Sequence, residues 1–482
     1  MVGDNLEQSE TIYREHLERT RVMDKTNVLF IVTDDQRYNT IHAMGNDEII
    51  TPTLDALVKD GTYFNNAYIP CGLNGAVCMP SRAMLNTGMD LYKLEGNGET
   101  IPEGHVLLGE HLRNNGYYAF GTGKWHNGPP AYTRSFDEKN NAFFSGMWDH
   151  WNVPSCHLDP TGKYDNVINF VTDFYRSKDI TKINCDKFNP GVHSSKLLTD
   201  TTIRFLENYK GDEPFYCYTA YLAPHDPRTM PQKYLDMYKD IKISLPENFM
   251  PEYPVAYGET KMRDELLTPY PRTSERTLSE LRDYYAMITH LDDEIGRIIE
   301  VLKEKNIYEN TVIILCGDNG LGVGSHGFMG KQNHFEHSIK IPLIIKGPEL
   351  PKNHIVESKV YLYDIFPTLC DYLGLEIPDS VEGKSFYKCF TDGGEHREQM
   401  YYSFGSTVRS IRSGDYKLSE YIGEKGERST LLFNVVEDPF EVHNLATKSK
   451  QKVLDMRREL LRMREKVGDI SRPQSLDFWS RF

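Results

Sequence analysis

The sequence has no hydrophobic run long enough to cross a membrane. A membrane-spanning helix needs roughly 18 or more consecutive apolar residues, whereas the longest apolar runs here, such as 27–33, have the length of a strand. The chain also has no internal repeat and no low-complexity tract. We therefore expect no helical membrane span and no disordered or collagen-like chain.

The chain has fewer basic than acidic residues. Lysine and arginine total 55 against 70 aspartate and glutamate residues, which gives a net charge of −15. Such an acidic chain is a poor candidate for non-specific nucleic-acid binding, because that binding depends on basic residues that neutralise phosphates. An anionic small substrate is still compatible with this charge, since a cationic pocket can lie within an acidic surface.

Cysteine pairs of the metal-binding or redox type are also missing. The eight cysteines are spread along the chain and form no Cys-x-x-Cys motif. We expect few or no disulfides. The first 26 residues lack the apolar core of a signal peptide and predict a short charged helix. On this basis we expect a cytoplasmic protein, whereas a chain already trimmed of its signal would be exported.

The remaining composition, with 39% hydrophobic residues, is that of a globular protein. Apolar strand-like runs alternate with helical patterns, which predicts a large mixed, mostly parallel sheet sandwiched by helices. The expected strands are 27–33, 117–121, 215–221, 311–316 and 341–345, and the expected helices are 53–59, 284–303 and 364–374.

After about residue 401 the pattern changes to short alternating strands. We expect strands at 410–412, 416–420 and 430–434 and a charged helix at 449–467. This predicts a smaller C-terminal α+β subdomain with a short antiparallel sheet. The domains would then be an N-terminal helical extension (1–26), a catalytic domain (27–385) and the C-terminal subdomain (386–482).

Two long segments, 127–166 and 245–272, show no periodicity. The first contains Trp148 and Trp151, and the second is rich in proline and tyrosine. Long loops in compact domains often carry function. An interpretation as surface excursions without a role stays equally open.

Oxygen-bearing side chains follow two of the predicted strands. Asp34 and Asp35 come directly after 27–33, and Asp318 and Asn319 follow 311–316. Ligands of open α/β sheets bind at the carboxyl ends of the strands. Hard cations such as Ca²⁺ or Mg²⁺ prefer carboxylate and amide oxygens. Each pair taken alone would also suit a structural, capping or turn role.

A third signal is the segment GAVCMPSRAMLNTG. Pro80 followed by Ser-Arg-Ala-Met-Leu predicts a helix, which places Cys78 just before its first turn. That position faces backbone N–H donors and is a natural anion site, and Arg82 adds a cation nearby. The alternative is a buried cysteine that merely precedes a helix.

Cys78-x-Pro80-Ser81-Arg82 resembles the signature of the type I, formylglycine-dependent sulfatases of the alkaline-phosphatase-like superfamily. Other segments agree with the resemblance, which covers residues 27–446. They are NVLFIVTDDQR, GTGKWH, the Asp-Asn-Gly run with SHGFMGKQNHFEHSIKIPLII, and LFNVVEDPFEVHNLA. One departure is Asn127-Gly128 after Gly-Lys-Trp-His, where Leu-Gly is common in the family.

The resemblance implies that a maturation enzyme oxidises Cys78 to formylglycine, whose hydrate is the nucleophile. It also implies a role for each matching residue. Asp34, Asp35, Asp318, Asn319 and the modified Cys78 would bind one Ca²⁺. Arg82 would hold the hydrate, Lys124 and His126 would contact the hydrate and the sulfate, and His225 and Lys331 would contact the sulfate and the ester oxygen.

Further roles follow from the same resemblance. His126 would accept the proton of the second hydroxyl, a protonated His225 or Lys331 would serve as general acid, and His326 would be a further substrate contact. An alternative role for Lys331 is to pair with Glu336 and fix its loop.

The predicted function is hydrolysis of a sulfate monoester on a small molecule or glycan. A sulfated carbohydrate is favoured because no strongly apolar loop suggests a steroid pocket, and the Trp and Tyr residues of the two long loops would suit stacking on a sugar. Alternatives are a phosphonate or phosphate ester hydrolase of the same superfamily, and a non-catalytic ligand-binding protein in which Cys78 is never modified.

Overall fold

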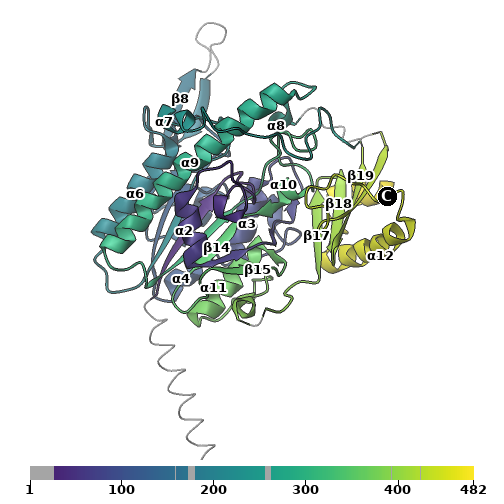
Figure 1. The fold of residues 1–482 in the computed structure, drawn as a ribbon. Helices are drawn as coiled ribbons and strands as arrows, with labels where there is room; N and C mark the ends of the chain where they lie inside the picture. Colours follow the sequence, from purple (N-terminus) through teal and green to yellow (C-terminus); the bar gives the residue numbers. More distant parts are fainter. Residues whose placement is uncertain (1–25, 158, 172–179, 256–261, 392, 424) are drawn as a thin grey trace, which may run out of the picture.

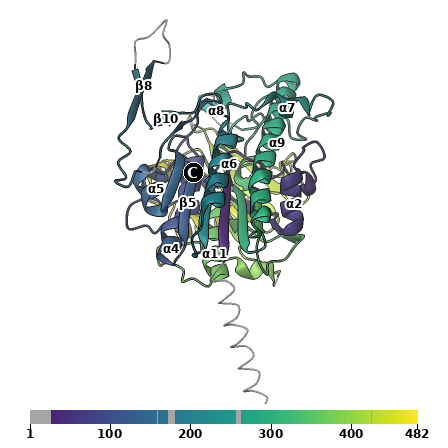
Figure 2. The ribbon, with the colours of Figure 1, turned by 90° about the vertical axis from the view of Figure 1, so that its left-hand side faces the viewer.

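A computed structural model of the chain describes residues 26–157, 159–171, 180–255, 262–391, 393–423 and 425–482. The helix expected before residue 26 lies outside these residues. The described chain is built around an eight-stranded sheet with helices on both faces (Figures 1 and 2). The predicted fold class is therefore confirmed.

The strand order of the large sheet is β15-β2-β14-β12-β1-β11-β5-β6. The strands are β1 (Asn27–Thr33), β2 (Thr62–Phe64), β5 (Tyr118–Lys124), β6 (Glu138–Phe143), β11 (Phe215–Ala220), β12 (Thr311–Gly317), β14 (Leu343–Lys346) and β15 (His354–Val356). From β12 through β6 all pairings are parallel, and β14 runs antiparallel to β12 and β2. The carboxyl ends of the central strands therefore meet at one edge.

The central strand β1 is buried on both faces. Val28, Phe30 and Val32 belong to one hydrophobic cluster, whereas Leu29 and Ile31 belong to another. Because alternate side chains of a strand point to opposite faces, a continuous apolar run is what a doubly covered strand requires. The helices of the first cluster include α3 (Cys78–Thr87), α4 (Leu108–Asn114), α5 (Pro129–Ser135) and α11 (Ile365–Leu373). The second cluster contains residues of α2 (Pro52–Asp60), α6 (Ser194–Asn208) and α9 (Ser274–Glu304).

A second sheet lies beside the first and contains most of the C-terminal part (Figure 1). Its order is β20-β19-β18-β17-β4. The strands are β4 (Cys71–Gly72), β17 (Gln399–Phe404), β18 (Val408–Ser413), β19 (Tyr416–Ile422) and β20 (Arg428–Asn434), and α12 (Lys450–Val467) covers them. Strands β17 to β20 are antiparallel, while β4 pairs in parallel with β17. The N-terminal part thus contributes a strand to this sheet.

Several predicted elements differ from the observed ones. The strand expected at 341–345 is divided at Pro342, which has no N–H for a ladder, into β13 (Lys340–Ile341) and β14. Helix α9 begins ten residues earlier than expected; its first turn (274–277) contains no apolar residue, and the Thr273 side chain accepts from the Arg276 amide. The segment 127–166, expected as a loop, contains α5 and β6.

The smaller elements complete the described chain. They are β3 (Ala67–Tyr68), β7 (Pro154–Ser155), β8 (Val167–Val171), β9 (Ile180–Asn184), β10 (Lys187–Phe188), β16 (Val360–Tyr361), α7 (Gln232–Asp236), α8 (Arg263–Leu266), α10 (Glu336–Ile339), α13 (Pro473–Arg481) and four short 3-10 helices (His42–Met44, Glu95–Gly98, Leu362–Asp364, Tyr387–Phe390). Within the described ranges, no helix combines the length and the apolar character needed to span a membrane. The eight cysteines are all buried free thiols.

Candidate active site

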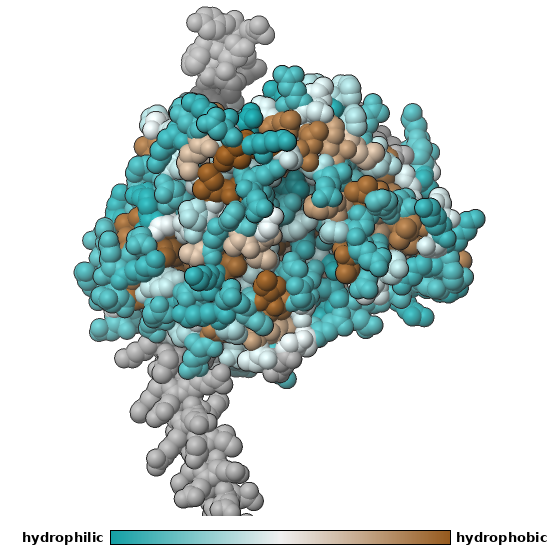
Figure 3. Space-filling model, in the orientation of Figure 1, coloured by the Kyte–Doolittle hydropathy of each residue, from teal (hydrophilic) through white to brown (hydrophobic). Residues whose placement is uncertain are grey.

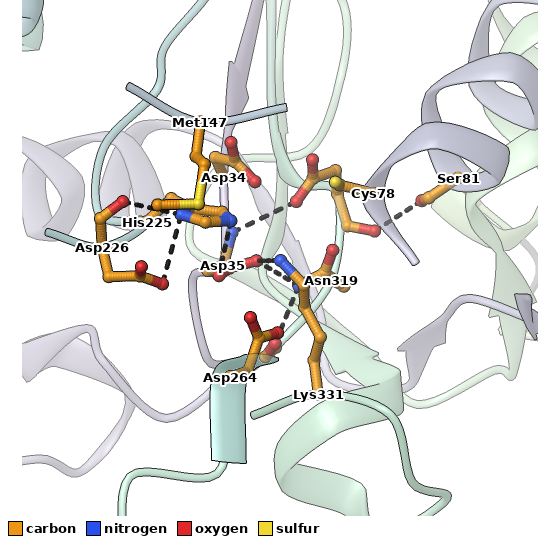
Figure 4. Close-up of polar contacts among 12 residues, drawn as sticks. Asp34, Asp35, Cys78, Ser81, Met147, His225, Asp226, Asp264, Asn319 and Lys331 are labelled. Atoms are coloured by element: carbon orange, nitrogen blue, oxygen red, sulfur yellow. Dashed lines mark hydrogen bonds and ion pairs between the residues drawn. The ribbon is translucent and has the colours of Figure 1, made fainter. Parts of the chain in front are cut away.

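Two adjacent parallel strands bring the acidic pairs together. Strands β1 and β12 run in register, with Thr33 opposite Gly317, so the residues that follow each strand become neighbours. The backbone amide of Asp35 donates to Asp318 Oδ1 at 3.2 Å. The side-chain amide of Asn319 donates through Nδ2 to Asp35 Oδ1 at 2.7 Å. Figure 4 shows the side chains of Asp35 and Asn319 pointing toward one another. The predicted convergence of the two pairs is present in the structure.

Helix α3 places the cysteine and the arginine of the signature beside this cluster. Cys78 is the first residue of α3 and is 4% exposed. One turn later, the fully buried Arg82 donates to Asp318 Oδ2 at 2.8 Å and to the Lys124 carbonyl at 2.8 Å. The hydrogen bonds of Arg82 therefore orient the carboxylate of Asp318 and the end of β5. The hydroxyl of Ser81 also donates to the Asp318 carbonyl, at 2.5 Å.

Lys124 and His126, at the end of β5, reach Cys78. The thiol sulfur of Cys78 lies 3.7 Å from Lys124 Nζ and 3.5 Å from His126 Nδ1, and Lys124 Nζ also pairs with Asp34 Oδ2. His126 adopts a left-handed backbone with φ 71°, which is rare for a residue other than glycine and is typical of functional sites. Burial, together with the nearby Lys124 and Arg82 cations, holds the pKa of His126 well below its usual range.

His225 approaches the same carboxylates from the neighbouring strand β11. Its Nε2 lies 3.6 Å from Asp35 Oδ2, while its Nδ1 lies 2.9 Å from the carbonyl of Asp226. The Asp226 carbonyl can accept only from a protonated Nδ1. This contact turns Nε2 toward the cluster.

Lys331 completes the group from the segment before α10. Its Nζ pairs with Asp35 Oδ1, and the residue is 3% exposed. The alternative pairing of Lys331 with Glu336 is wrong, because Glu336 is bound by Lys417 Nζ at 2.8 Å and by the Tyr68 hydroxyl at 2.7 Å. Spacing along the chain suggested the pair, but the partners of Glu336 come from β3 and from β19 of the C-terminal sheet.

His326 has its contacts elsewhere. Its Nε2 lies 3.0 Å from the Glu441 carbonyl and its ring stacks on Phe335 with centroids 3.8 Å apart. Burial lowers the pKa of His326 to about 4. The structure therefore packs His326 against the C-terminal segment, in contrast to the other predicted site residues.

The donor set fits a hard cation. Among the described residues, three oxygens of the cluster are buried without a hydrogen-bond partner: Asp34 Oδ1, Asp35 Oδ2 and Asn319 Oδ1. Burying a polar atom costs free energy unless the atom is hydrogen-bonded or binds a cation. Asp34, Asp35 and His225 also offer ligand atoms that all lie within 4.8 Å of one another. Oxygen-rich sites of this kind suit Ca²⁺ or Mg²⁺.

The charges of the cluster point to the same conclusion. Burial raises the pKa of Asp318 to about 7, with the neighbouring Asp34 carboxylate adding to the effect. For Asp34, burial acts in the same direction, but the surrounding cations, Lys124 first and also Arg82, outweigh it and hold the pKa well below its usual range. Carboxylates crowded in this way repel one another unless cations separate them.

Other residues at the site lacked a sequence signal of their own. The Tyr284 hydroxyl of α9 donates to the Asp35 carbonyl at 2.5 Å and accepts from the Arg37 amide at 2.9 Å. Arg263 of α8 forms ion pairs with two carboxylates beside His225. Its Nη1 lies 2.8 Å from Asp226 Oδ2, and its Nη2 pairs with Asp264 Oδ1. Helix α8 lies in a segment without periodicity, so only the fold brings it to the site. Trp148 and Trp151, expected at the pocket, pack on Phe188 and His193.

Comparison with known proteins identifies two family models. The model described as "Sulfatase" matches residues 26–375. A model described as "N-sulphoglucosamine sulphohydrolase, C-terminal" matches residues 324–466. The first covers well over half of the chain.

Three individual proteins illustrate the likeness. An arylsulfatase of Clostridium perfringens is 26% identical over 471 residues, which cover 91% of this chain and 94% of that protein. A structure in complex with its substrate D-glucosamine-2-N,6-O-disulfate aligns with a TM-score of 0.70 at 21% identity, over 93% of this chain and 99% of the other. A phosphonate monoester hydrolase of Agrobacterium radiobacter aligns with a TM-score of 0.69 at 22% identity, over 92% of this chain and 96% of the other.

Proposed function

Because the chain belongs to the sulfatase family and is thus a sulfuric ester hydrolase, we propose that it cleaves the sulfate monoester of a carbohydrate, using one Ca²⁺ and a formylglycine made from Cys78. The observation that carries the proposal is the convergence of Lys124 and His126 on the sulfur of Cys78, beside the carboxylates of Asp34 and Asp35. These five side chains come from three parts of the chain, the end of β1, the end of β5 and the start of α3, and meet at one sheet edge.

The thiol itself is a poor nucleophile in this position. Burial raises the pKa of Cys78, so the sulfur stays protonated at neutral pH, whereas the thiolate is the reactive form of cysteine. A formylglycine made by a separate maturation enzyme would supply, as its hydrate, an oxygen nucleophile at the same position. This agrees with the resemblance of residues 78–82 to the family signature.

Asp34, Asp35, Asp318 and Asn319 would hold the cation, which would polarise a sulfate oxygen when bound. The ammonium groups of Lys124 and Lys331 stand beside the same carboxylates and would bind sulfate oxygens, where charge develops during the reaction. Since the lowered pKa of His126 leaves its ring neutral at neutral pH, it can accept a proton from the hydrate. A His225 protonated on both ring nitrogens would give its Nε2 proton to the departing alcohol, and Arg82 would orient Asp318.

The carbohydrate substrate is supported by the neighbour that binds a sulfated glucosamine. The polar Arg263, Asp226 and Asp264 group beside His225 also suits a hydroxyl-rich alcohol better than an apolar one. A phosphonate monoester hydrolase is the second candidate, because a neighbour with that activity shares the fold.

The two candidate reactions are separated by one assay. We expect the matured enzyme to turn over p-nitrophenyl sulfate and sulfated monosaccharides with a higher kcat/KM than phenyl p-nitrophenyl phosphonate. Intact-mass analysis of the same preparation should show the thiol of Cys78 converted to an aldehyde. A higher kcat/KM on the phosphonate, measured with converted protein, would contradict the proposed function.

Metal content tests the oxygen cluster. We expect purified, undialysed protein to contain Ca²⁺ at about one ion per chain, the number that a single set of oxygen ligands holds. Asp34→Asn and Asp318→Asn should lose the ion, because each removes a carboxylate. Asp364→Asn is a matched control, since Asp364 is equally buried but pairs with Arg397 away from the cluster. Elemental analysis that finds stoichiometric zinc and no calcium would exclude this assignment.

A further inference from the structure

A second cavity opens on the molecule away from the candidate active site. It has a volume of about 680 Å³ and lies between the segment after β1, the start of β13 and the loop after β20. The face drawn in Figure 3 is hollowed near its middle, close to α10 of Figure 1, among mainly hydrophilic residues. None of the proposed catalytic or metal-binding residues lines this cavity.

The cavity nevertheless adjoins the active site through two short segments. Asp35 belongs to the cluster, and Arg37 and Tyr38, two and three residues later, line the cavity. Lys331 likewise faces Asp35, while Glu336 and Lys340 of the following residues line the cavity. The two sites are therefore built from neighbouring residues of the same two segments.

One cation in the cavity has no partner of its own. Among the residues that the structure describes, Lys340 Nζ has no hydrogen-bond or ion-pair partner and lies 4.4 Å from the centre of the Tyr38 ring. Burial lowers the pKa of Lys340 to about 8, although the nearby Glu336 carboxylate acts in the opposite direction. A charged ammonium held in this way would gain from an anionic ligand, which would replace its lost hydration.

The other cations of the cavity are already engaged. Arg412 lies 3.9 Å from Glu336 Oε2 and bonds the Tyr68 hydroxyl. Arg37 donates to Asn39 Oδ1 and to the Gly322 carbonyl, both at 3.1 Å. Lys340 is thus the cation left to meet a ligand.

The rest of the lining sets the size and charge of that ligand. The carboxylates of the cavity are Asp47, Glu48, Glu247, Glu336 and Glu357, against the cations Arg37, Lys340 and Arg412. This excess of negative charge opposes a nucleotide or any other polyanion. The same carboxylates and the tyrosine hydroxyls can, however, bond the hydroxyl groups of a neutral ring.

Aromatic rings also line the cavity. Tyr38, Tyr285 and Phe440 line the cavity together with amide side chains such as Asn39 and Asn46. Aromatic faces with nearby polar groups suit sugars, whose rings have apolar faces and hydroxyl edges. We propose that this cavity is a second binding site, for a saccharide unit that carries a single negative charge and places it against Lys340.

Protection of the lysine from chemical modification tests the proposal on the intact protein. Reductive methylation with formaldehyde and cyanoborohydride near pH 8 should modify Lys340, and peptide mass spectrometry reports each lysine separately. A ligand present at about ten times its Kd should slow the reaction of Lys340 about tenfold, because only the free fraction reacts. Lys352, whose side chain is 57% exposed, provides the internal control and should be unaffected.

The probes are glucuronic acid, galacturonic acid and glucose 6-sulfate, with glucose as the uncharged control. The sulfate is used with Cys78→Ala protein so that it is not turned over. Protection by at least one of the acids and not by glucose supports the site, and comparison of carboxylates with sulfate identifies the acid group. Equal protection by glucose, or protection by none of the acids, overturns the proposal.

Direct binding of the protecting acid, followed by saturation-transfer NMR, separates the lysine charge from its packing. Lys340→Met keeps the alkyl chain over Tyr38 and should weaken binding at least about tenfold, whereas Lys340→Arg should retain it. Equal binding to wild type and Lys340→Met would also overturn the proposal. None of these readouts depends on sulfate ester hydrolysis, so they remain valid if the proposed function fails.

Discussion

Replacing Cys78 by alanine is expected to abolish sulfate ester hydrolysis. The loss should be on the order of 10⁶-fold in kcat, the scale on which an enzyme falls when its nucleophile is removed. The fold should survive, because within the described residues the polar contacts of the Cys78 thiol are those of 3.5 Å and 3.7 Å to His126 and Lys124. The deletion of this small group should cost about 1 kcal/mol of unfolding free energy.

The matched control is Cys370→Ala. Cys370 is also fully buried, on α11, but it belongs to the hydrophobic cluster beneath the sheet. It should lose a similar amount of stability in thermal unfolding and retain kcat. Calcium content should be close to wild type in both variants, because the carboxylates remain. If Cys78→Ala kept more than a few per cent of the activity, the nucleophile would lie elsewhere.

The sequence predicts those parts of the molecule that are determined by the residue pattern of a short segment. A continuous apolar run such as 27–33 can be satisfied only by a strand covered on both faces, and β1 has those bounds. The residues after β1 and β12 could likewise be placed together, because parallel strands end at one sheet edge. Asp34, Asp35, Asp318 and Asn319 are close in the structure for this reason.

Contacts between distant segments could not be predicted in the same way. Glu336 lies five residues from Lys331, yet its partner Lys417 comes from β19 of the other sheet. Arg263 reaches Asp226 from a segment without periodicity, and His326 turns toward Glu441. The contacts of Glu336 and His326 depend on how the C-terminal part packs against the rest of the chain, and that of Arg263 depends on where α8 lies; no local pattern encodes either.

Replacing Lys331 is also expected to have a large effect on activity. Its ammonium pairs with Asp35 and is buried. Burial lowers the pKa of Lys331, but the Asp35 carboxylate and the other nearby carboxylates together outweigh it and raise the pKa above its usual range, so the group is charged at neutral pH. Lys331→Met retains the length of the side chain and removes the charge. We expect kcat/KM to fall about 10²–10³-fold, as when one donor to a developing anion is lost, and inhibition by free sulfate to weaken in parallel.

Glu336→Gln distinguishes this role from fixation of the loop. Glu336 is bonded to Lys417 and Tyr68 and makes no contact with Lys331. Its replacement should lower the unfolding temperature, because the Lys417 ion pair is buried, while kcat/KM changes less than about tenfold, since the sulfate contact remains. The double variant should show the kinetic defect of Lys331→Met and the instability of Glu336→Gln, since the two residues act on different contacts. Equal and non-additive losses of kcat/KM in the two single variants would show instead that Lys331 acts through the loop, and the ammonium would then have no direct part in binding sulfate.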